Sequence, residues 1–148
     1  MRTVRDECGN RYLLLKQSSD SSRVRDPETG EERHLPNESL KVVEGESPLE
    51  TASRVVPDPV RRVVTATHDD RSLGLLVEID ERGPVDVRVL LDAYDLCESD
   101  LHGLLAEFRA AGLIREVEVA GGRGYDTTET ASDGLAALTT ARSPESDH

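Results

Sequence analysis

The side chains of this sequence that could bind a metal ion are few and widely spaced. Neighbouring histidines along the chain are at least 34 residues apart, at His34, His68, His102 and His148. The two cysteines, Cys8 and Cys97, are far apart and form no ligand pair. Protein metal sites need several such ligands, usually at short and characteristic spacings. We therefore expect no metal site and no cofactor.

The sequence also lacks the motifs of covalent and phosphate chemistry. The stretch AGGRG at 120–124 is rich in glycine, but it lacks the Lys-Ser pair of a phosphate-binding loop and does not begin a helix. No nucleophile motif surrounds any of the serines. We expect that the protein is not an enzyme, and that 120–124 is the tip of a β-hairpin.

Cys97 allows two interpretations. It is expected at the N-cap of a helix, where the helix N-terminus lowers the pKa of a thiol, so it could sense the redox state. Alternatively, it is a small buried cap residue behind Leu96, since a free cysteine usually packs like a small apolar residue. We favour the second interpretation.

The stretch 97–114, CESDLHGLLAEFRAAGLI, predicts an amphipathic helix over 98–111 that ends at Gly112. Its apolar residues recur at the spacing of one buried helical face, as Leu101, Leu104, Leu105 and Phe108. Its exposed face carries three carboxylates against Arg109, namely Glu98, Asp100 and Glu107. This face has the layout of a surface that reads another macromolecule, but it is acidic.

The elements before this helix fall into a β region and a helical connector. Short strands are expected at 11–16, 22–26 and 31–36, with the turn PETG before the third strand. They predict a small antiparallel β meander, a β-sheet domain over 1–43 that needs a partner to cover one face. Residues 44–58 are predicted to be a helical connector, with a capping box at Ser47-Pro48-Leu49-Glu50.

The remaining residues predict a mostly helical domain over 59–141 and a disordered tail over 142–148. We expect helices at 59–67, 71–81, 86–94, 98–111 and 129–141, and strands at 113–119 and 125–128. The first helix should present Val60, Val63 and Val64 on one face, and the last should present Ala131, Leu135 and Leu138. The fold class is therefore α+β.

This order of elements is typical of a winged helix-turn-helix domain. Two stretches, FRAAGLI at 108–114 and YDTTETASDGLAAL at 125–138, are similar to the corresponding parts of the MarR-, ArsR- and PadR-like regulators. The resemblance covers 71–141, about half of the chain. It implies that the 98–111 helix enters the major groove of double-stranded DNA.

Transferred to this sequence, the resemblance places Ser99, Asp100, His102, Gly103, Ala106 and Glu107 at the groove. The sequence departs from the family here, because the family carries arginine, serine or lysine at several of these positions. Asp100 and Glu107 would repel phosphates, although a carboxylate can accept a hydrogen bond from cytosine. The basic candidates are Arg88, Arg109 and Arg123, of which Arg123 at the hairpin tip could reach a phosphate or the minor groove.

The composition affects how the acidic face of the 98–111 helix is interpreted. The formal net charge is −12, from 30 acidic and 18 basic residues, and only Lys16 and Lys41 are lysines. Such compositions resemble those of salt-loving archaea, whose molar salt reduces the Debye length to about 3 Å. The acidic balance therefore does not exclude nucleic acid. The sequence shows no membrane span and no signal peptide, so we expect a cytoplasmic protein.

Two functional hypotheses follow. In the first, the protein is a DNA-binding transcriptional regulator of a haloarchaeon and acts as a homodimer. In the second, it is a winged-helix adaptor that meets a protein partner through the small residues Gly103, Ala106 and Ala110. A simpler interpretation of this stripe is that another helix of the same domain packs against it.

Overall fold

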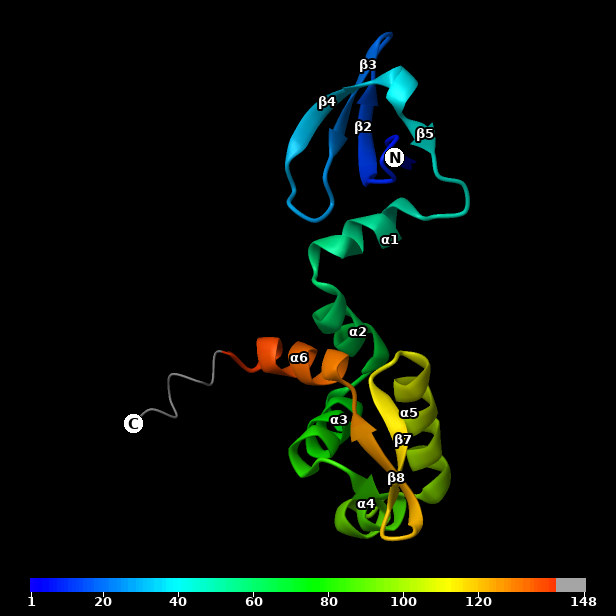
Figure 1. The fold of residues 1–148 in the computed structure, drawn as a ribbon, viewed down its shortest axis with the longest axis vertical. Coiled ribbons are helices and arrows are strands. Elements are labelled where there is room, and N and C mark those ends of the chain that lie inside the picture. Colours follow the sequence, from blue (N-terminus) through cyan, green and yellow to red (C-terminus); the bar gives the residue numbers. More distant parts are fainter. Residues whose placement is uncertain (141–148) are drawn as a thin grey trace, which may run out of the picture. The chain divides into compact units, whose positions relative to one another are not determined.

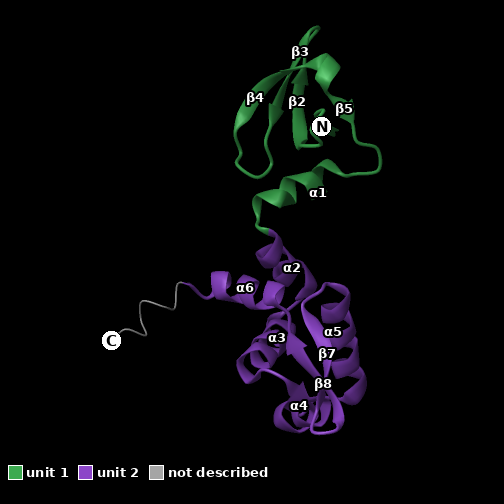
Figure 2. Cartoon of the chain, in the orientation of Figure 1, with its two compact units in different colours: residues 1–57 green, residues 58–148 purple. Residues whose placement is uncertain are grey.

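The computed structural model describes residues 1–140, and the tail predicted at 142–148 lies outside them. The chain divides into two compact units, residues 1–57 and the residues from Asp58 onward (Figure 1, Figure 2). Each unit has its own cluster of buried apolar side chains. The two units are therefore described one at a time.

The first unit is built on a five-stranded antiparallel sheet. Its strands are β1 (Arg2–Arg5), β2 (Arg11–Gln17), β3 (Ser21–Arg25), β4 (Glu32–Pro36) and β5 (Lys41–Val42), in the order β4-β3-β2-β1-β5. A 3-10 helix, η1 (Asn37–Ser39), precedes β5. The predicted meander is confirmed as β2, β3 and β4. The sheet is larger than predicted, since β1 and β5 were not expected.

A short helix covers part of this sheet. Helix α1 (Pro48–Ala52) continues into the 3-10 helix η2 (Ser53–Val55). The buried hydroxyls of Thr3 on β1 and Thr51 on α1 form a hydrogen bond of 2.7 Å, and Thr51 also donates to Glu46 at 2.9 Å. Ser47 caps α1 by accepting from the backbone N–H of Leu49. The contacts of residues 44–57 thus group them with the first unit.

The second unit is a winged helix-turn-helix domain, and the predicted α+β class is confirmed. Its elements are α2 (Asp58–Ala66), α3 (Asp70–Arg82), β6 (Val85–Asp86), α4 (Val87–Tyr94), α5 (Glu98–Ala110), β7 (Ile114–Val119), β8 (Gly122–Thr127) and α6 (Glu129–Leu138). The strands form a sheet in the order β6-β8-β7. The helix pair α4–α5 and the hairpin β7–β8 are the two parts that define the fold.

The core of the second unit holds α5 in place. Leu101, Leu105 and Phe108 of α5 are fully buried, together with Leu76, Ile79, Leu90 and Leu113 from neighbouring elements. The apolar spacing in the sequence therefore identified the buried face of α5. Leu104 lies at the edge of this face and is half-buried.

Two apolar residues that the sequence analysis placed on buried faces are exposed. Val64 on α2 is 54% exposed and Leu138 on α6 is 47% exposed. The two helices lie close together at Gly134, where an added Cβ would be 2.5 Å from the carbonyl oxygen of Pro59. Val64 and Leu138 line the same open hollow beside this crossing, so both remain partly accessible.

Candidate functional site

In the helix-turn-helix, the first helix has a side-chain cap and the second does not. Asp86 caps α4, and its side chain accepts from the backbone N–H of Arg88 at 2.8 Å. Asp95 has a φ of 50°, in the left-handed region, and turns the chain between the two helices. Cys97 is the N-cap of α5, as expected. The turn and the buried face of α5 together decide which residues α5 exposes.

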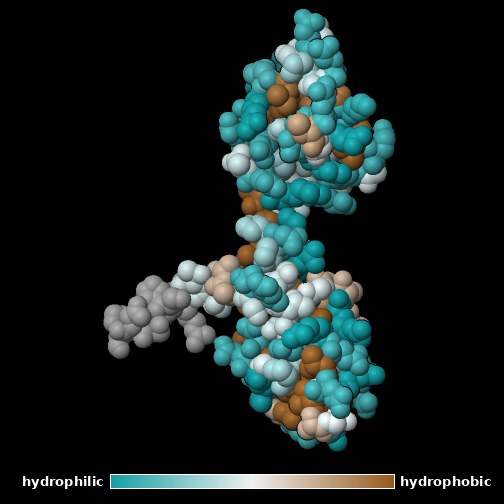
Figure 3. Space-filling view, viewed as in Figure 1, coloured by the Kyte–Doolittle hydropathy of each residue, from teal (hydrophilic) through white to brown (hydrophobic). Residues whose placement is uncertain are grey.

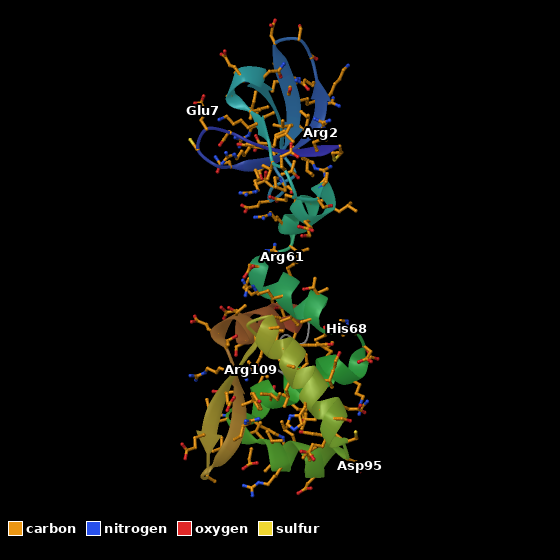
Figure 4. All side chains as sticks on the ribbon, turned by 90° about the vertical axis from the view of Figure 1, so that its right-hand side faces the viewer. Arg2, Glu7, Arg61, His68, Asp95 and Arg109 are labelled. Atoms are coloured by element: carbon orange, nitrogen blue, oxygen red, sulfur yellow. The ribbon has the colours of Figure 1, made fainter. Side chains whose placement is uncertain are left out.

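The predicted groove-facing residues all lie on the exposed side of α5. Ser99, Asp100, His102, Gly103, Ala106 and Glu107 are exposed, as are Arg109 and Ala110. In Figure 4, α5 lies in front of the other elements of the second unit, between the labelled Asp95 and Arg109. The structure therefore brings these predicted site residues together on one face.

The stripe of small residues on α5 does not pack within its own unit. Gly103, Ala106 and Ala110 are exposed, and an added Cβ at Gly103 would meet nothing within 4 Å. The simple interpretation, in which another helix of the domain covers the stripe, is therefore wrong. Its residues leave the backbone of α5 open to close approach from outside.

The tip of the hairpin is shorter than predicted, and Arg123 is not part of it. The turn is formed by Ala120 and Gly121, whose φ angles are 51° and 78°. Two residues of positive φ give the tight turn that matches the twist of a β-hairpin. Arg123 lies on β8, directly opposite Glu118 of β7. Its place at the tip was a wrong prediction, since the glycines on both sides belong to the strand.

One carboxylate links α5 to the hairpin. One carboxylate oxygen of Glu116 on β7 lies 3.3 Å from Nη1 of Arg109, and the other oxygen lies 3.3 Å from Nε of Arg123. Figure 1 shows β7 and β8 beside α5, in agreement with the contacts between α5 and β7. Arg109 and Arg123 thus come from different elements but meet at Glu116.

The other site residues with ionisable side chains also have polar partners. Arg88 binds Asp86 at 3.0 Å, His102 lies 3.6 Å from Glu98, and Asp100 lies 3.7 Å from Arg71. The side-chain hydrogen bond from Arg88, followed by the bond from its backbone N–H, lowers the pKa of Asp86. The arginines of this surface are therefore held in place, but their charge is largely balanced.

Sequence reasoning did not identify the partners of these charged residues. Asp86 was predicted only as a helix cap, and neither Glu116 nor Arg71 was considered. The spacing of Asp86 and Arg88 was a usable local signal. The bridge through Glu116 depends on the register of β7 against β8 and on the position of α5, which the sequence does not reveal.

Cys97 is exposed, which contradicts the favoured prediction of a buried cap residue. Its sulfur lies 3.0 Å from the hydroxyl oxygen of Ser99. Hydrogen bonds from that hydroxyl, and from the backbone N–H groups of Asp100 and Ser99, lower the pKa of the thiol. The side chain is exposed because α5 starts at the surface, one residue after the half-buried Leu96.

Residues 1–140 contain neither a metal-ligand cluster nor a membrane-spanning helix. No group of three or more histidine, cysteine, aspartate or glutamate side chains within this range is arranged to hold a metal ion. Within the same range, every helix is too short or too polar to cross a membrane. Hydrophilic residues cover most of the face of each unit that Figure 3 shows.

Comparisons with known proteins give one family and one solved structure. A crystal structure of an ArsR family transcriptional regulator is similar, with a TM-score of 0.43 and 16% sequence identity, over 62% of this chain and 94% of that chain. No curated protein matches the sequence. Residues 1–139 match a family of unknown function, DUF7346, so the match includes the whole first unit and most of the second. The chain therefore belongs to this family, DUF7346.

Proposed function

We propose that the second unit binds double-stranded DNA and that the protein is a transcriptional regulator. Helix α5 lies in the major groove, and the β7–β8 hairpin lies against the neighbouring backbone. The observation that supports this most strongly is the exposure of α5 beside the hairpin, with its outward face uncovered by its own unit. A winged helix reads DNA through this pair of elements.

The dimensions of α5 fit this role. It has 13 residues, which at 1.5 Å per residue gives a length of about 20 Å. The major groove is about 12 Å wide and accepts a helix. Gly103 and Ala106 in the middle of the exposed face allow the helix backbone to approach the base edges closely. Ser99 and His102 offer hydrogen-bonding groups to those edges.

The ion pairs of this face determine how it binds. Phosphates must compete with Glu116 for Arg109 and Arg123, and with Asp86 for Arg88. Each arginine that changes partner gives up one ion pair as it gains another, so the net gain is small. We therefore expect weak binding to DNA of arbitrary sequence, and a larger contribution from shape and direct base contact.

The proposal is tested by removing two arginines whose side chains are mostly exposed. The side chain of Arg88 is 75% exposed and that of Arg123 is 59% exposed. The double variant Arg88→Ala, Arg123→Ala should lower the affinity for duplex DNA about tenfold or more, and should reduce the dependence of binding on salt. Fluorescence anisotropy with a labelled duplex, over a series of potassium chloride concentrations, measures both.

Arg115 provides a matched control. It lies on β7, its side chain is 65% exposed, and it pairs with Asp126 at 3.5 Å. Because side chains alternate along a strand, Arg115 points to the face of the hairpin opposite to Glu116. Arg115→Ala should leave the affinity within about twofold of the parent. Equal losses in the control and the double variant would contradict the proposed surface, as would no DNA binding by the folded parent.

We further propose that the protein acts in the cytoplasm as a homodimer, with one α5 in each half of a two-fold symmetric DNA site. Val64 and Leu138, which are exposed on α2 and α6, support a seam at these helices. The variant Val64→Glu, Leu138→Glu should sediment as a monomer, whereas the parent should sediment as a dimer. A monomeric parent at the same concentration would contradict the dimer without affecting the DNA surface.

A further inference from the structure

The first unit contains a polar cavity that the DNA-binding proposal does not use. Its volume is about 350 Å³, and its lining includes Arg11 at the start of β2, Arg33 on β4, Arg54 on η2, Tyr12, Asp26 and Glu28. The three arginines come from separate segments of the chain. The fold of the first unit is what brings them together.

Two of these arginines are positioned by one carboxylate outside the lining. One carboxylate oxygen of Glu46 lies 2.7 Å from Nε of Arg11, and the other oxygen lies 3.4 Å from Nη2 of Arg54. The Glu46 side chain is only 14% exposed, while Arg11 and Arg54 are 37% and 44% exposed. The two Nη atoms of Arg11, and Nε and Nη1 of Arg54, take no part in these two pairs.

Arg33 is held more loosely than Arg11. Within residues 1–140 it forms one ion pair, in which its Nη2 lies 3.7 Å from a carboxylate oxygen of the exposed Glu31. Its side chain is 45% exposed, so a ligand in the cavity can recruit it at little cost. A guanidinium presents several N–H donors in a planar fork that matches the oxygens of a carboxylate or a phosphate.

The balance of charge distinguishes this cavity from three other hollows of the described residues. Here the lining has three arginines and two carboxylates, whereas carboxylates outnumber arginines in the other three. One of the two carboxylates, Asp26, already accepts the backbone N–H of Glu28 at 2.9 Å and holds the β3–β4 turn. Glu46 and Glu31 pair with these arginines from outside the lining, so the excess of arginine is a property of the lining itself.

We propose that this cavity binds a small oxyanion with at least two anionic groups, either phosphates or carboxylates. Its volume lies within the range of about 300–1,000 Å³ that small-molecule sites occupy, and its polar lining suits a polar ligand. A long polyanion fits poorly, because the exposed Glu31 and Glu32, next to Arg33 in the sequence, would repel the part of it that extends beyond the cavity. The site is independent of DNA binding by the second unit.

Calorimetric titration of the full chain with pyrophosphate, and separately with citrate, tests this proposal. At least one of the two anions should bind saturably with a stoichiometry of one. The anion that binds with the higher affinity shows whether the site prefers phosphates or carboxylates. Arg33→Gln should weaken that binding about tenfold, since it removes a charge-assisted hydrogen bond. The variant should keep the fold, because the side chain is half-exposed and its ion pair is long.

Arg23→Gln is the matched control. Arg23 is on the same sheet, is 49% exposed, pairs with Glu32 at 3.5 Å, and does not line the cavity. Its substitution should leave the affinity unchanged. Binding by neither anion would overturn the proposal, as would equal weakening by both variants. Weakening by Arg88→Gln but not by Arg33→Gln would place the anion on the second unit and would also overturn it.

Discussion

At the scale of single residues, Glu116 limits the charge that the candidate DNA surface offers. It binds Arg109 and Arg123 at the same time, each at 3.3 Å. Replacing Glu116 with glutamine should free both guanidinium groups for phosphates and raise the affinity for duplex DNA several-fold. The same anisotropy measurement that tests the arginine variants measures this increase.

Glu118 is the control for this prediction. It is the next carboxylate on the same face of β7, lies opposite Arg123 in the register, and forms no ion pair within residues 1–140. Glu118→Gln removes the same charge without freeing an arginine, so its effect on affinity should be smaller. If the two variants increased affinity equally, net charge rather than the bridge would explain the result.

The thiol of Cys97 gives a second residue-scale prediction. The hydrogen bond from the Ser99 hydroxyl is the largest of the effects that lower its pKa. Removing this donor in Ser99→Ala should raise the pKa, so the alkylation rate should reach its plateau at a higher pH than in the parent. Iodoacetamide labelling across pH, followed by mass spectrometry of the Cys97 peptide, provides the measurement. Identical pH profiles would show that Ser99 does not stabilise the thiolate.

Single residues also show which features of the site could be predicted from the sequence. The periodic leucines of 98–111 identified the buried face of α5, and hence its exposed face, because helical geometry relates the two directly. The position of Arg123 could not be found in the same way. Gly121, Gly122 and Gly124 permit several turns, and only the pairing of β7 with β8 assigns the turn to Ala120 and Gly121.

At the scale of elements, the crossing of α2 and α6 depends on Gly134. A Cβ at this position would lie 2.5 Å from the carbonyl oxygen of Pro59 and 2.8 Å from Cγ2 of Val63. Gly134→Ala should therefore force the helices apart and destabilise the second unit by about 1–3 kcal/mol. Chemical denaturation followed by circular dichroism measures the change.

Gly103 is a matched helical glycine with open space around it. Gly103→Ala should stabilise the protein by ~0.5–1 kcal/mol, because alanine is the better helix former. Opposite signs for the two glycines would support the packing of α6 on α2. Destabilisation by both, to the same degree, would mean that the helix crossing is not at Gly134.

The elements themselves were predictable to different degrees. The helices of the second unit were expected close to their observed bounds, since caps and apolar periodicity are local signals. The strands β1 and β5 were missed, because Arg2–Arg5 and Lys41–Val42 are short and polar and exist only through pairing with each other and with β2. Such strands leave no pattern that a single sequence reveals.

At the scale of the whole molecule, the two units have separate cores, and in the first unit Glu46 links stability to pH. Desolvation of Glu46 favours the protonated form, but the hydrogen bonds from Arg11 and Thr51 and the charges of Arg11 and Arg54 together outweigh it and lower the pKa. A lowered pKa in the folded state means that the stabilisation is complete above the ordinary pKa of glutamate. It is lost as the pH falls through the folded value.

Glu46→Gln should therefore lower the melting temperature of the first unit by a few degrees at neutral pH. It should also reduce the loss of stability between neutral pH and the acid range. Backbone amide signals followed by NMR report each unit separately, and the second unit should be unaffected. Glu44, which is exposed and forms no ion pair within residues 1–140, provides the control Glu44→Gln. If Glu46→Gln lost as much stability in acid as the parent, this would contradict the role of the Glu46 carboxylate in the pH dependence.

The central claim, that α5 and the β7–β8 hairpin read DNA, is tested most directly by selection from a pool of random duplexes. The full chain is used to capture duplexes over several rounds, and the captured DNA is sequenced. We expect a shared sequence to be enriched by the parent and lost with the double variant Arg88→Ala, Arg123→Ala. No enrichment by the folded parent, or the same enriched sequence with both proteins, would contradict the account.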